Sequence, residues 1–292
     1  ITMFLNYSEY NNLQTYEQLD EKLIIVGKGK KYGQIMFIAG GAGSGKGFAI
    51  TNFLEGEKFK VKDPDELKKA FLKVAKEKDK YPEIKDLDLK KPEDVFKLHA
   101  FVANKGTAGK LLGNLLKDAD ISAKKGTLPN IIFDRTMKDM NDVDKILPLL
   151  DASGYDRKNI HLTWVLTDYK VAIKNNTTRD RVVPADILLQ THVGAAKTIY
   201  SILKGKTDSG IQGDINVILN NRENTIPFVD SEGEPIKGSR SKQVIVKDFT
   251  YLNMKKQGRR FNNEASIQKQ LYSWVKNNAP EDALDNIKEP EL

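Results

Sequence analysis

The chain has 292 residues, an apolar fraction of 39%, a charged fraction of 30% and a net charge of +7. This composition is typical of a folded protein that is long enough to bury a substantial core. The absence of cysteine excludes disulfides, thiolate metal sites and thiol catalysis. No stretch reaches the roughly 18 apolar residues of a membrane-spanning helix and no signal-peptide pattern opens the chain, so we expect a cytoplasmic protein with no membrane contact.

The positive charge raises the question of a nucleic-acid partner. Lysines alternate with acids, as where Asp65 and Glu66 precede Lys68 and Lys69. Such alternation is typical of a solvated helix face, and a protein that handles small anionic substrates would carry the same charge. Nucleic acid stays open as a partner, and the sequence identifies no protein partner.

A glycine-rich loop is the most informative motif. Polar residues 1–33 precede it as an N-terminal extension, and the apolar run from Gln34 to Ala39 predicts the strand that enters it. A helix to about Leu54 follows. The predicted nucleotide-binding residues are Gly40, Gly41, Ala42, Gly43, Ser44, Gly45, Lys46, Gly47 and Phe48. Backbone N–H groups in such a loop converge on phosphate, and Lys46 brings a charge to the β- and γ-phosphates. The motif predicts a site for ATP (or GTP).

One position departs from the usual motif. A serine or threonine normally follows the lysine and holds Mg²⁺, whereas this chain has Gly47 there. We therefore expect Mg²⁺ to be held mostly by water and by a carboxylate elsewhere. A degenerate loop that only binds nucleotide is the alternative that Gly47 leaves open.

The next segments combine a short strand with helices. We expect a strand at Phe59 to Val61 and a helix from Glu66 to about Lys76. Residues 78–128 read as a helical insertion, with helices at 92–104 and 108–117, where a lid or an acceptor-binding lobe would lie. His99 lies on the first of these helices and is a candidate substrate contact, although a packed or surface histidine explains it as well.

Strands and helices alternate through the rest of the chain. We expect strands at 130–134, 159–167 and 215–219, helices at 141–150 and 264–275, and a helical tract at 169–203 that Pro184 interrupts. Arms at 226–229 and 243–246 predict a β-hairpin, and the chain after Pro280 should fray. The predicted fold is α/β: a three-layer P-loop NTPase fold with a mostly parallel sheet. It comprises a P-loop domain at 34–219 and a C-terminal extension at 220–292.

Ligands of parallel sheets bind at the carboxyl ends of the strands, so the residues that follow each strand are candidates. Asp63 and Asp65 follow the second strand. One of them should cap the next helix and the other should accept a proton from a substrate hydroxyl. We assign Asp65 as the base and Asp63 as a substrate contact.

The next strand ends in Asp134 and Arg135. Asp134 is the predicted Mg²⁺ ligand, acting through water, and Arg135 is a predicted substrate contact; a structural ion pair between them is the alternative. Asn176, Arg179 and Arg181 follow a later strand, and the first two should share a helix face. Arginines there can fork onto phosphate oxygens, unless they are ordinary solvated side chains.

These motifs together resemble the zeta-toxin-like P-loop kinases, in particular members encoded by large tailed phages. The similarity rests on the loop Gly40–Gly47, on Asp63-x-Asp65 and on Asn176-x-x-Arg179-x-Arg181, and covers about residues 34–205. It implies that Lys46 binds phosphates, that Asp65 is the base and that Arg179 and Arg181 stabilise the transferred charge. Known zeta toxins phosphorylate UDP-N-acetylglucosamine, but no acceptor-binding lobe matches here. A phage origin would imply the host cytoplasm.

The sequence thus predicts a phosphotransferase that moves the ATP γ-phosphate to a hydroxyl of a small molecule, nucleotide or nucleotide sugar. A polynucleotide 5′-hydroxyl kinase is one alternative, supported by the basic stretch from Asn220 to Arg260. A P-loop ATPase or nucleotide-binding module of a phage assembly is another. His161 should be structural, and the three histidines show no zinc-ligand spacing.

Overall fold

The computed structural model describes most of the chain between residues 24 and 290. The described residues are 24, 26–27, 32–54, 59–78, 80–105, 127–221, 229–235, 250–288 and 290. For residues 64–67, 92 and 286 the backbone is described without the side chain. The predicted helix at 108–117 and most of the predicted N-terminal extension lie outside the described residues.

A six-stranded sheet forms the centre of the molecule, in the order β2-β3-β1-β4-β5-β6. The strands are β1 (Ile35–Ala39), β2 (Lys60–Lys62), β3 (Ile131–Asp134), β4 (Ile160–Thr167), β5 (Ile215–Asn220) and β6 (Thr250–Lys255). The first five are parallel, and β6 pairs antiparallel with β5. Every residue of β1 and β4 is buried, as expected for apolar parallel strands that are covered on both faces. The predicted mostly parallel α/β fold is confirmed.

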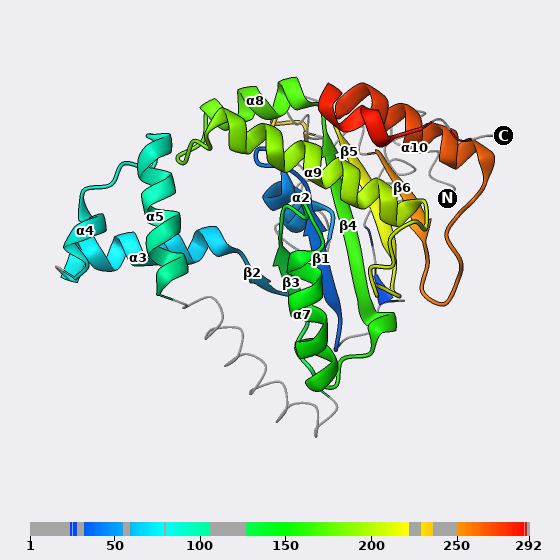
Figure 1. The fold of residues 1–292 in the computed structure, drawn as a ribbon, viewed down its shortest axis with the longest axis horizontal. Helices are drawn as coiled ribbons and strands as arrows, with labels where there is room; N and C mark the ends of the chain where they lie inside the picture. The colour runs from blue at the N-terminus through cyan, green and yellow to red at the C-terminus, as the bar shows by residue number, and fades with distance from the viewer. Residues whose placement is uncertain are drawn as a thin grey trace, which may run out of the picture.

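Helices cover both faces of this sheet (Figure 1). The described helices of the chain are α2 (Lys46–Asn52), α3 (Pro64–Lys78), α4 (Pro82–Lys85), α5 (Pro92–Asn104), α7 (Asn141–Ala152), α8 (Tyr169–Thr177), α9 (Ala185–Leu203) and α10 (Ala265–Asn278), with 3₁₀ turns η3 (Arg157–Asn159) and η4 (Glu281–Asn286); all but α3, α4 and α5 lie on or beside the sheet. Ile35 and Phe37 of β1 pack into a cluster with α7, α9 and α10. Met36 and Ile38 pack on the other face against α2. The alternation along β1 therefore supplies both cores.

A lobe made of α3, α4 and α5 projects away from the sheet (Figure 1). It has its own cluster of buried residues, which includes Leu72, Ile84 and Leu98. The rings of Phe71, Tyr81 and Phe101 close this cluster, with each pair of centroids 5.4–5.6 Å apart. The lobe is thus an independently packed wall beside the sheet, and the boundaries of the domains stay a prediction.

Two predictions concern the C-terminal side of the chain. The predicted hairpin arms lie outside the described residues except at Val229, which forms an isolated antiparallel bridge with Pro235. The described residues after Pro280 do not fray up to residue 288: they form η4, and Ala283 and Ile287 are buried in the main core. The expectation of fraying was wrong because it relied on the acidic composition of the segment. The segment also carries two apolar side chains, four residues apart, that pack in the same cluster as residues of α9. Among the described residues, none of the helices is long and apolar enough to cross a membrane.

Candidate functional site

The glycine-rich loop joins β1 to α2 at the carboxyl edge of the sheet. Ile38 of β1 lies in register with Asp134 of β3 on one side and with Thr163 of β4 on the other. Because these strands are parallel, the residues that end β3 and β4 meet the loop at one edge. This is the juxtaposition that the strand-end analysis predicted.

The loop has a backbone conformation that its glycines permit. Gly43 has φ 74° and Gly45 has φ 86°, both in the left-handed region. A Cβ at Gly43 would lie 2.7 Å from the Ala172 carbonyl oxygen, and one at Gly45 would lie 2.7 Å from Asn220 Nδ2. Both positions therefore require glycine for conformation and for space. The loop is a tightly packed cradle, as a phosphate site needs.

Side chains at the ends of β4 and β5 and on α8 bind the carbonyls of the loop. The Ser44 carbonyl accepts hydrogen bonds from Thr167 Oγ1 at 2.7 Å and from Asn220 Nδ2 at 2.9 Å. Asn175 Nδ2 donates to the Gly43 carbonyl at 3.3 Å. Sequence reasoning missed these three residues, although Thr167 and Asn220 are the last residues of β4 and β5 and could have been found by that position.

Lys46 and Asp134 meet at the mouth of the loop. Lys46 Nζ donates to the carbonyls of Gly40 at 2.9 Å and Gly41 at 3.2 Å, and it lies 3.7 Å from Asp134 Oδ1. The two side chains are only 13% and 16% exposed, so their charges act with little screening by water. A lysine beside a carboxylate at a phosphate cradle can bind a nucleotide together with its cation.

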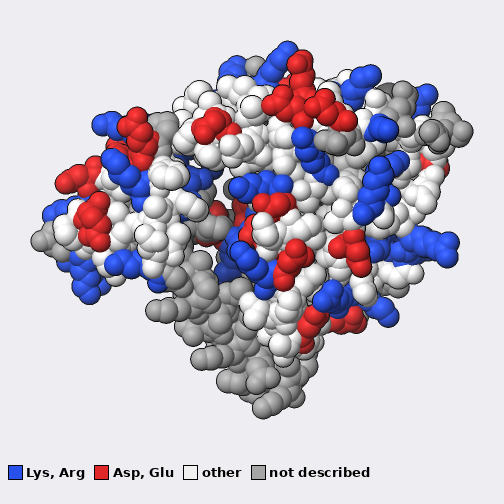
Figure 2. Space-filling model, viewed as in Figure 1, with Lys and Arg blue, Asp and Glu red and all other residues white. Residues whose placement is uncertain are grey.

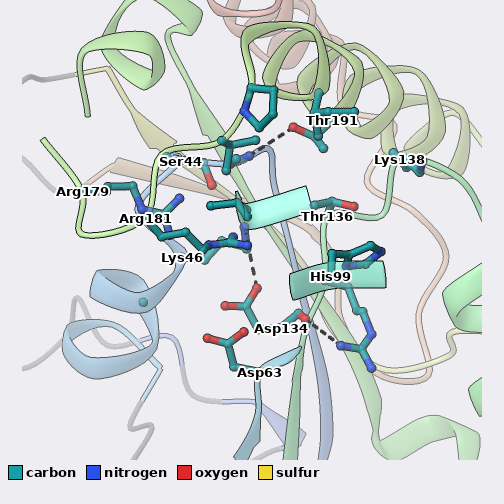
Figure 3. A pocket seen from close by; sticks show the side chains of 18 of the residues that line it. Ser44, Lys46, Asp63, His99, Asp134, Thr136, Lys138, Arg179, Arg181 and Thr191 are labelled. Carbon is teal, nitrogen blue, oxygen red and sulfur yellow. Dashed lines mark hydrogen bonds and ion pairs between the residues drawn. The ribbon is translucent and has the colours of Figure 1, made fainter. Parts of the chain in front are cut away.

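A cavity of about 870 Å³ opens in front of this pair, between the loop and the α3–α5 lobe. Figure 2 shows the hollow beside the lobe, with basic side chains at its rim, and Figure 3 shows the side chains that line it. The predicted site residues that line it are Ala42, Gly43, Ser44, Gly45, Lys46, Gly47, Asp63, His99, Asp134, Arg135, Arg179 and Arg181. The fold thus brings together predicted site residues from five segments of the chain.

Gly40, Gly41 and Phe48 are absent from the cavity lining. The carbonyls of Gly40 and Gly41, at the start of the loop, accept hydrogen bonds from Lys46 Nζ. Phe48 is 37% exposed and packs edge-on against Phe53, outside the cavity lining. The side chain of Asp65 lies outside the described residues, so its role as the base stays a prediction.

Arg135 is held against the cavity wall by its neighbours. Its guanidinium donates to the Asp134 backbone carbonyl at 3.0 Å and lies 3.7 Å from Asp142 Oδ1 through Nε. It also lies over the Phe133 ring, 5.9 Å from the centroid. Arg135 therefore binds the backbone carbonyl of Asp134, and not its carboxylate as the alternative prediction had it. The Arg135 side chain remains part of the cavity lining.

Arg179 and Arg181 lie on the linker between α8 and α9. The expectation that Asn176 and Arg179 share a helix face was wrong, because α8 ends at Thr177. Asn176 is buried instead: its Nδ2 donates to the Val183 carbonyl at 2.8 Å, and its Oδ1 accepts from the Val183 N–H at 2.9 Å. This paired contact closes the linker and presents both arginines to the cavity.

Sequence reasoning also missed part of the cavity wall. Lys68, Val95, Phe96, Lys138 and Thr191 line it as well. Phe96 is 65% exposed. The sequence feature that could have identified it is an aromatic residue that lies off the apolar stripe of α5. Asp168 follows β4 but caps α8, because its Oδ1 accepts from the Lys170 N–H at 2.8 Å.

His161 has the structural role that was predicted. It is fully buried at the other end of the sheet, where Nδ1 accepts from the Asp214 N–H at 2.8 Å and Nε2 lies 2.9 Å from Gln34 Oε1. Burial lowers its pKa to about 4. Within the described part of the chain, no group of three or more His, Cys, Asp or Glu side chains could hold a metal ion.

No protein-family model matches the sequence, and no curated protein matches it. Solved structures do resemble it. A chain of the AvrRxo1-ORF1:AvrRxo1-ORF2 crystal structure with sulphate ions is 14% identical, with a TM-score of 0.51 over 92% of this chain and 68% of that chain. A chain of the same pair with ATP gives 14% identity, a TM-score of 0.45, and 94% and 79% coverage.

A chain of the PezAT chromosomal toxin–antitoxin system of Streptococcus pneumoniae is 13% identical, with a TM-score of 0.35 over 74% of this chain and 79% of that one. The likeness to the AvrRxo1 complex with sulphate concerns the fold. It agrees with the α/β fold with a mostly parallel sheet described above.

Proposed function

We propose that this protein is a zeta-toxin-like kinase that transfers the γ-phosphate of ATP (or GTP) to a hydroxyl group of a small molecule, nucleotide or nucleotide sugar. The observation that carries the proposal is the Lys46–Asp134 pair, 3.7 Å apart, at a glycine-rich loop that faces a cavity of about 870 Å³. Arg135, Arg179 and Arg181 line the same cavity. An ATP-dependent reaction of this kind suits the cytoplasm.

The residues present fit a nucleoside triphosphate. The loop residues Ala42 to Gly47 line the cavity, where their backbone N–H groups could bind phosphate, and Lys46 adds a positive charge at the mouth of the loop. Mg²⁺, which neutralises phosphate charge in such reactions, would be held by Asp134 together with water and phosphate oxygens, because position 47 carries no hydroxyl. Arg179 and Arg181 would stabilise the charge on the transferred group.

The acceptor would lie between the loop and the lobe. Asp65 would take the proton from its hydroxyl, so that the oxygen forms a bond to phosphorus as the bond to the nucleoside diphosphate breaks. Asp63 and His99, which line the cavity, would contact the acceptor.

The charge of the lining favours an anionic acceptor. Among the lining residues whose side chains the structure describes, six are cations, Lys46, Lys68, Arg135, Lys138, Arg179 and Arg181, and three are carboxylates, Asp63, Asp134 and Asp142. This excess exceeds what a magnesium-bound triphosphate needs, so an acceptor that itself carries phosphate fits the site well.

The test is phosphoryl transfer from γ-labelled ATP with Mg²⁺ to nucleotide sugars, nucleosides, nucleotides and 5′-hydroxyl oligonucleotides. We expect a labelled small-molecule product that Lys46→Ala abolishes without loss of the fold. A labelled oligonucleotide would instead identify a polynucleotide kinase. Label released only as phosphate would identify an ATPase and reject the proposal.

Two variants distinguish the proposed roles of Asp65 and Asp63. Asp65→Asn should spare ATP affinity and remove transfer, whereas Asp63→Asn should chiefly raise the KM for the acceptor. If Asp65→Asn instead weakens ATP binding and leaves transfer at saturation intact, the assignment of the base is wrong.

A further inference from the structure

A single residue of the loop, Ala42, is held on both sides by two consecutive residues of α9. Its N–H donates to Thr191 Oγ1 at 3.3 Å, a contact drawn in Figure 3, and its carbonyl oxygen lies 2.8 Å from His192 Nε2. The peptide groups on either side of Ala42 therefore cannot rotate without breaking a contact to the helix beneath them.

The contact with the Ala42 carbonyl determines which nitrogen of the His192 ring carries a hydrogen. A carbonyl oxygen can only accept, so Nε2 of His192 carries the hydrogen and donates it. The ring is only 6% exposed, and burial lowers its pKa to about 4, so it is neutral near pH 7. The Tyr169 ring packs edge-on at 5.4 Å between centroids.

The ring also fills the space directly beneath the loop. A Cβ built on Gly41 would lie 2.1 Å from His192 Cδ2, so the imidazole is in van der Waals contact with the loop backbone. An apolar side chain of similar size, such as leucine, would fill the same space. It would not donate the hydrogen bond to the Ala42 carbonyl.

The direction of the loop carbonyls matters for phosphate binding. A backbone cradle attracts an anion when its N–H groups face the ligand and its carbonyls face away. The carbonyls of Gly43 and Ser44 are held by Asn175, Thr167 and Asn220, and His192 holds the carbonyl that precedes them. Three consecutive carbonyls are thus turned towards the protein.

We propose that His192 is a positioning residue that orients the glycine-rich loop for the nucleotide phosphates, by donating a hydrogen bond from Nε2 to the Ala42 carbonyl. This inference rests on the proposed function, because it assigns a role within the same nucleotide site. His192 does not line the cavity, so it acts through the loop and not by contact with substrate.

The experiment compares two variants that differ in the hydrogen bond. His192→Leu keeps the bulk and removes the donor, whereas His192→Gln places an amide N–H near the position of Nε2. Binding of a fluorescent ATP analogue and the KM for ATP are measured for both, with thermal unfolding as the check on the fold. We expect His192→Leu to weaken ATP binding about tenfold and His192→Gln to restore most of it.

A matched control is the other buried histidine. His161→Leu removes a hydrogen-bonded imidazole at the far end of the sheet, so it should lower the unfolding temperature and leave ATP binding unchanged. If His192→Leu does not fold, His192→Asn replaces it, since its shorter amide keeps polarity but cannot reach Ala42.

The outcomes are distinct. A folded His192→Leu (or Asn) variant that binds ATP as tightly as the wild type overturns the inference, and so does a folded His192→Gln variant that binds as weakly as His192→Leu. Wild-type protein that binds no nucleotide and transfers no phosphate overturns the proposed function itself, and the inference with it.

Discussion

Position 47 shows how much of a nucleotide site depends on one side chain. Gly47 stands where P-loops usually carry a metal-binding hydroxyl, and a Cβ built there meets no atom within 4 Å. The position also has a backbone that other residues can adopt, since its φ is not in the left-handed region. The absence of a hydroxyl is therefore not imposed by the packing around the loop.

We expect Gly47→Ser to keep the fold and to improve Mg²⁺ use. Serine is a better helix former than glycine, so stability should rise by up to about 0.5 kcal/mol. The new hydroxyl would give the cation a ligand beside Asp134, and the Mg²⁺ concentration for half-maximal activity should fall severalfold. Kinetic titration with Mg²⁺ measures this.

The matched control is Gly45→Ser, in the same loop. Gly45 has φ 86°, and a Cβ there would lie 2.7 Å from Asn220 Nδ2, so serine should distort the cradle and abolish nucleotide binding. Should Gly47→Ser leave the Mg²⁺ dependence unchanged while Gly45→Ser behaves as expected, the cation does not lie beside position 47.

At the scale of the element, the linker between α8 and α9 depends on Asn176. Asn176→Ala would remove both hydrogen bonds to Val183 and leave buried backbone groups unsatisfied, at a cost of about 1–3 kcal/mol. Because the linker carries Arg179 and Arg181, we also expect kcat to fall. Urea denaturation and steady-state kinetics measure the two effects.

Thr178→Ala is the matched control for the linker. Thr178 is exposed and donates only to the Asn175 carbonyl, at 3.1 Å, so its removal should change neither quantity much. A normal kcat for Asn176→Ala, despite lower stability, would mean that the linker does not position the arginines for catalysis.

Local sequence patterns predicted the helices and strands that carry a clear pattern of apolar residues of their own. The helix expected at 92–104 has those bounds in α5, and the apolar run before the glycines became β1. Strand β6 was missed although Leu252 and Met254 alternate inward along it. Its pairing depends on the open edge of β5, which no local pattern encodes, and the same holds for η4 against α9.

The residues of the site also fall into those that the sequence predicted and those that it did not. Lys46 and Asp134 were predicted because each lies in a motif with a known chemical use, and they do lie together. The anchors Thr167, Asn220 and His192 are single polar residues without a motif, and only the approach of distant strands and helices to the loop reveals them. Sequence therefore predicts the groups that would bind phosphate better than the groups that orient them.

At the scale of the whole molecule, two buried histidines couple stability to pH. Burial is the main cause that lowers the pKa of both His161 and His192 to about 4, against 6.5 in an unfolded chain. Asp214 opposes this shift for His161, as does the Ala42 carbonyl for His192, whereas the Lys46 cation reinforces it for His192. The folded state must therefore keep both rings neutral at pH values where the unfolded chain protonates them.

We expect the free energy of unfolding to be constant between about pH 7.5 and 6.5 and to fall between about pH 6.5 and 4. In that window the unfolded state binds more protons than the folded state, so the loss amounts to about 3 kcal/mol for each histidine. Asp94 and Asp151 have lowered pKa values, so their stabilising contributions are lost only at lower pH, below about 3.8. Urea denaturation from pH 7.5 to 4.5 measures the slope. His161→Gln should reduce it by about half, because the His192 contribution remains; an unchanged slope in that variant would mean that His161 does not titrate differently in the folded and unfolded states.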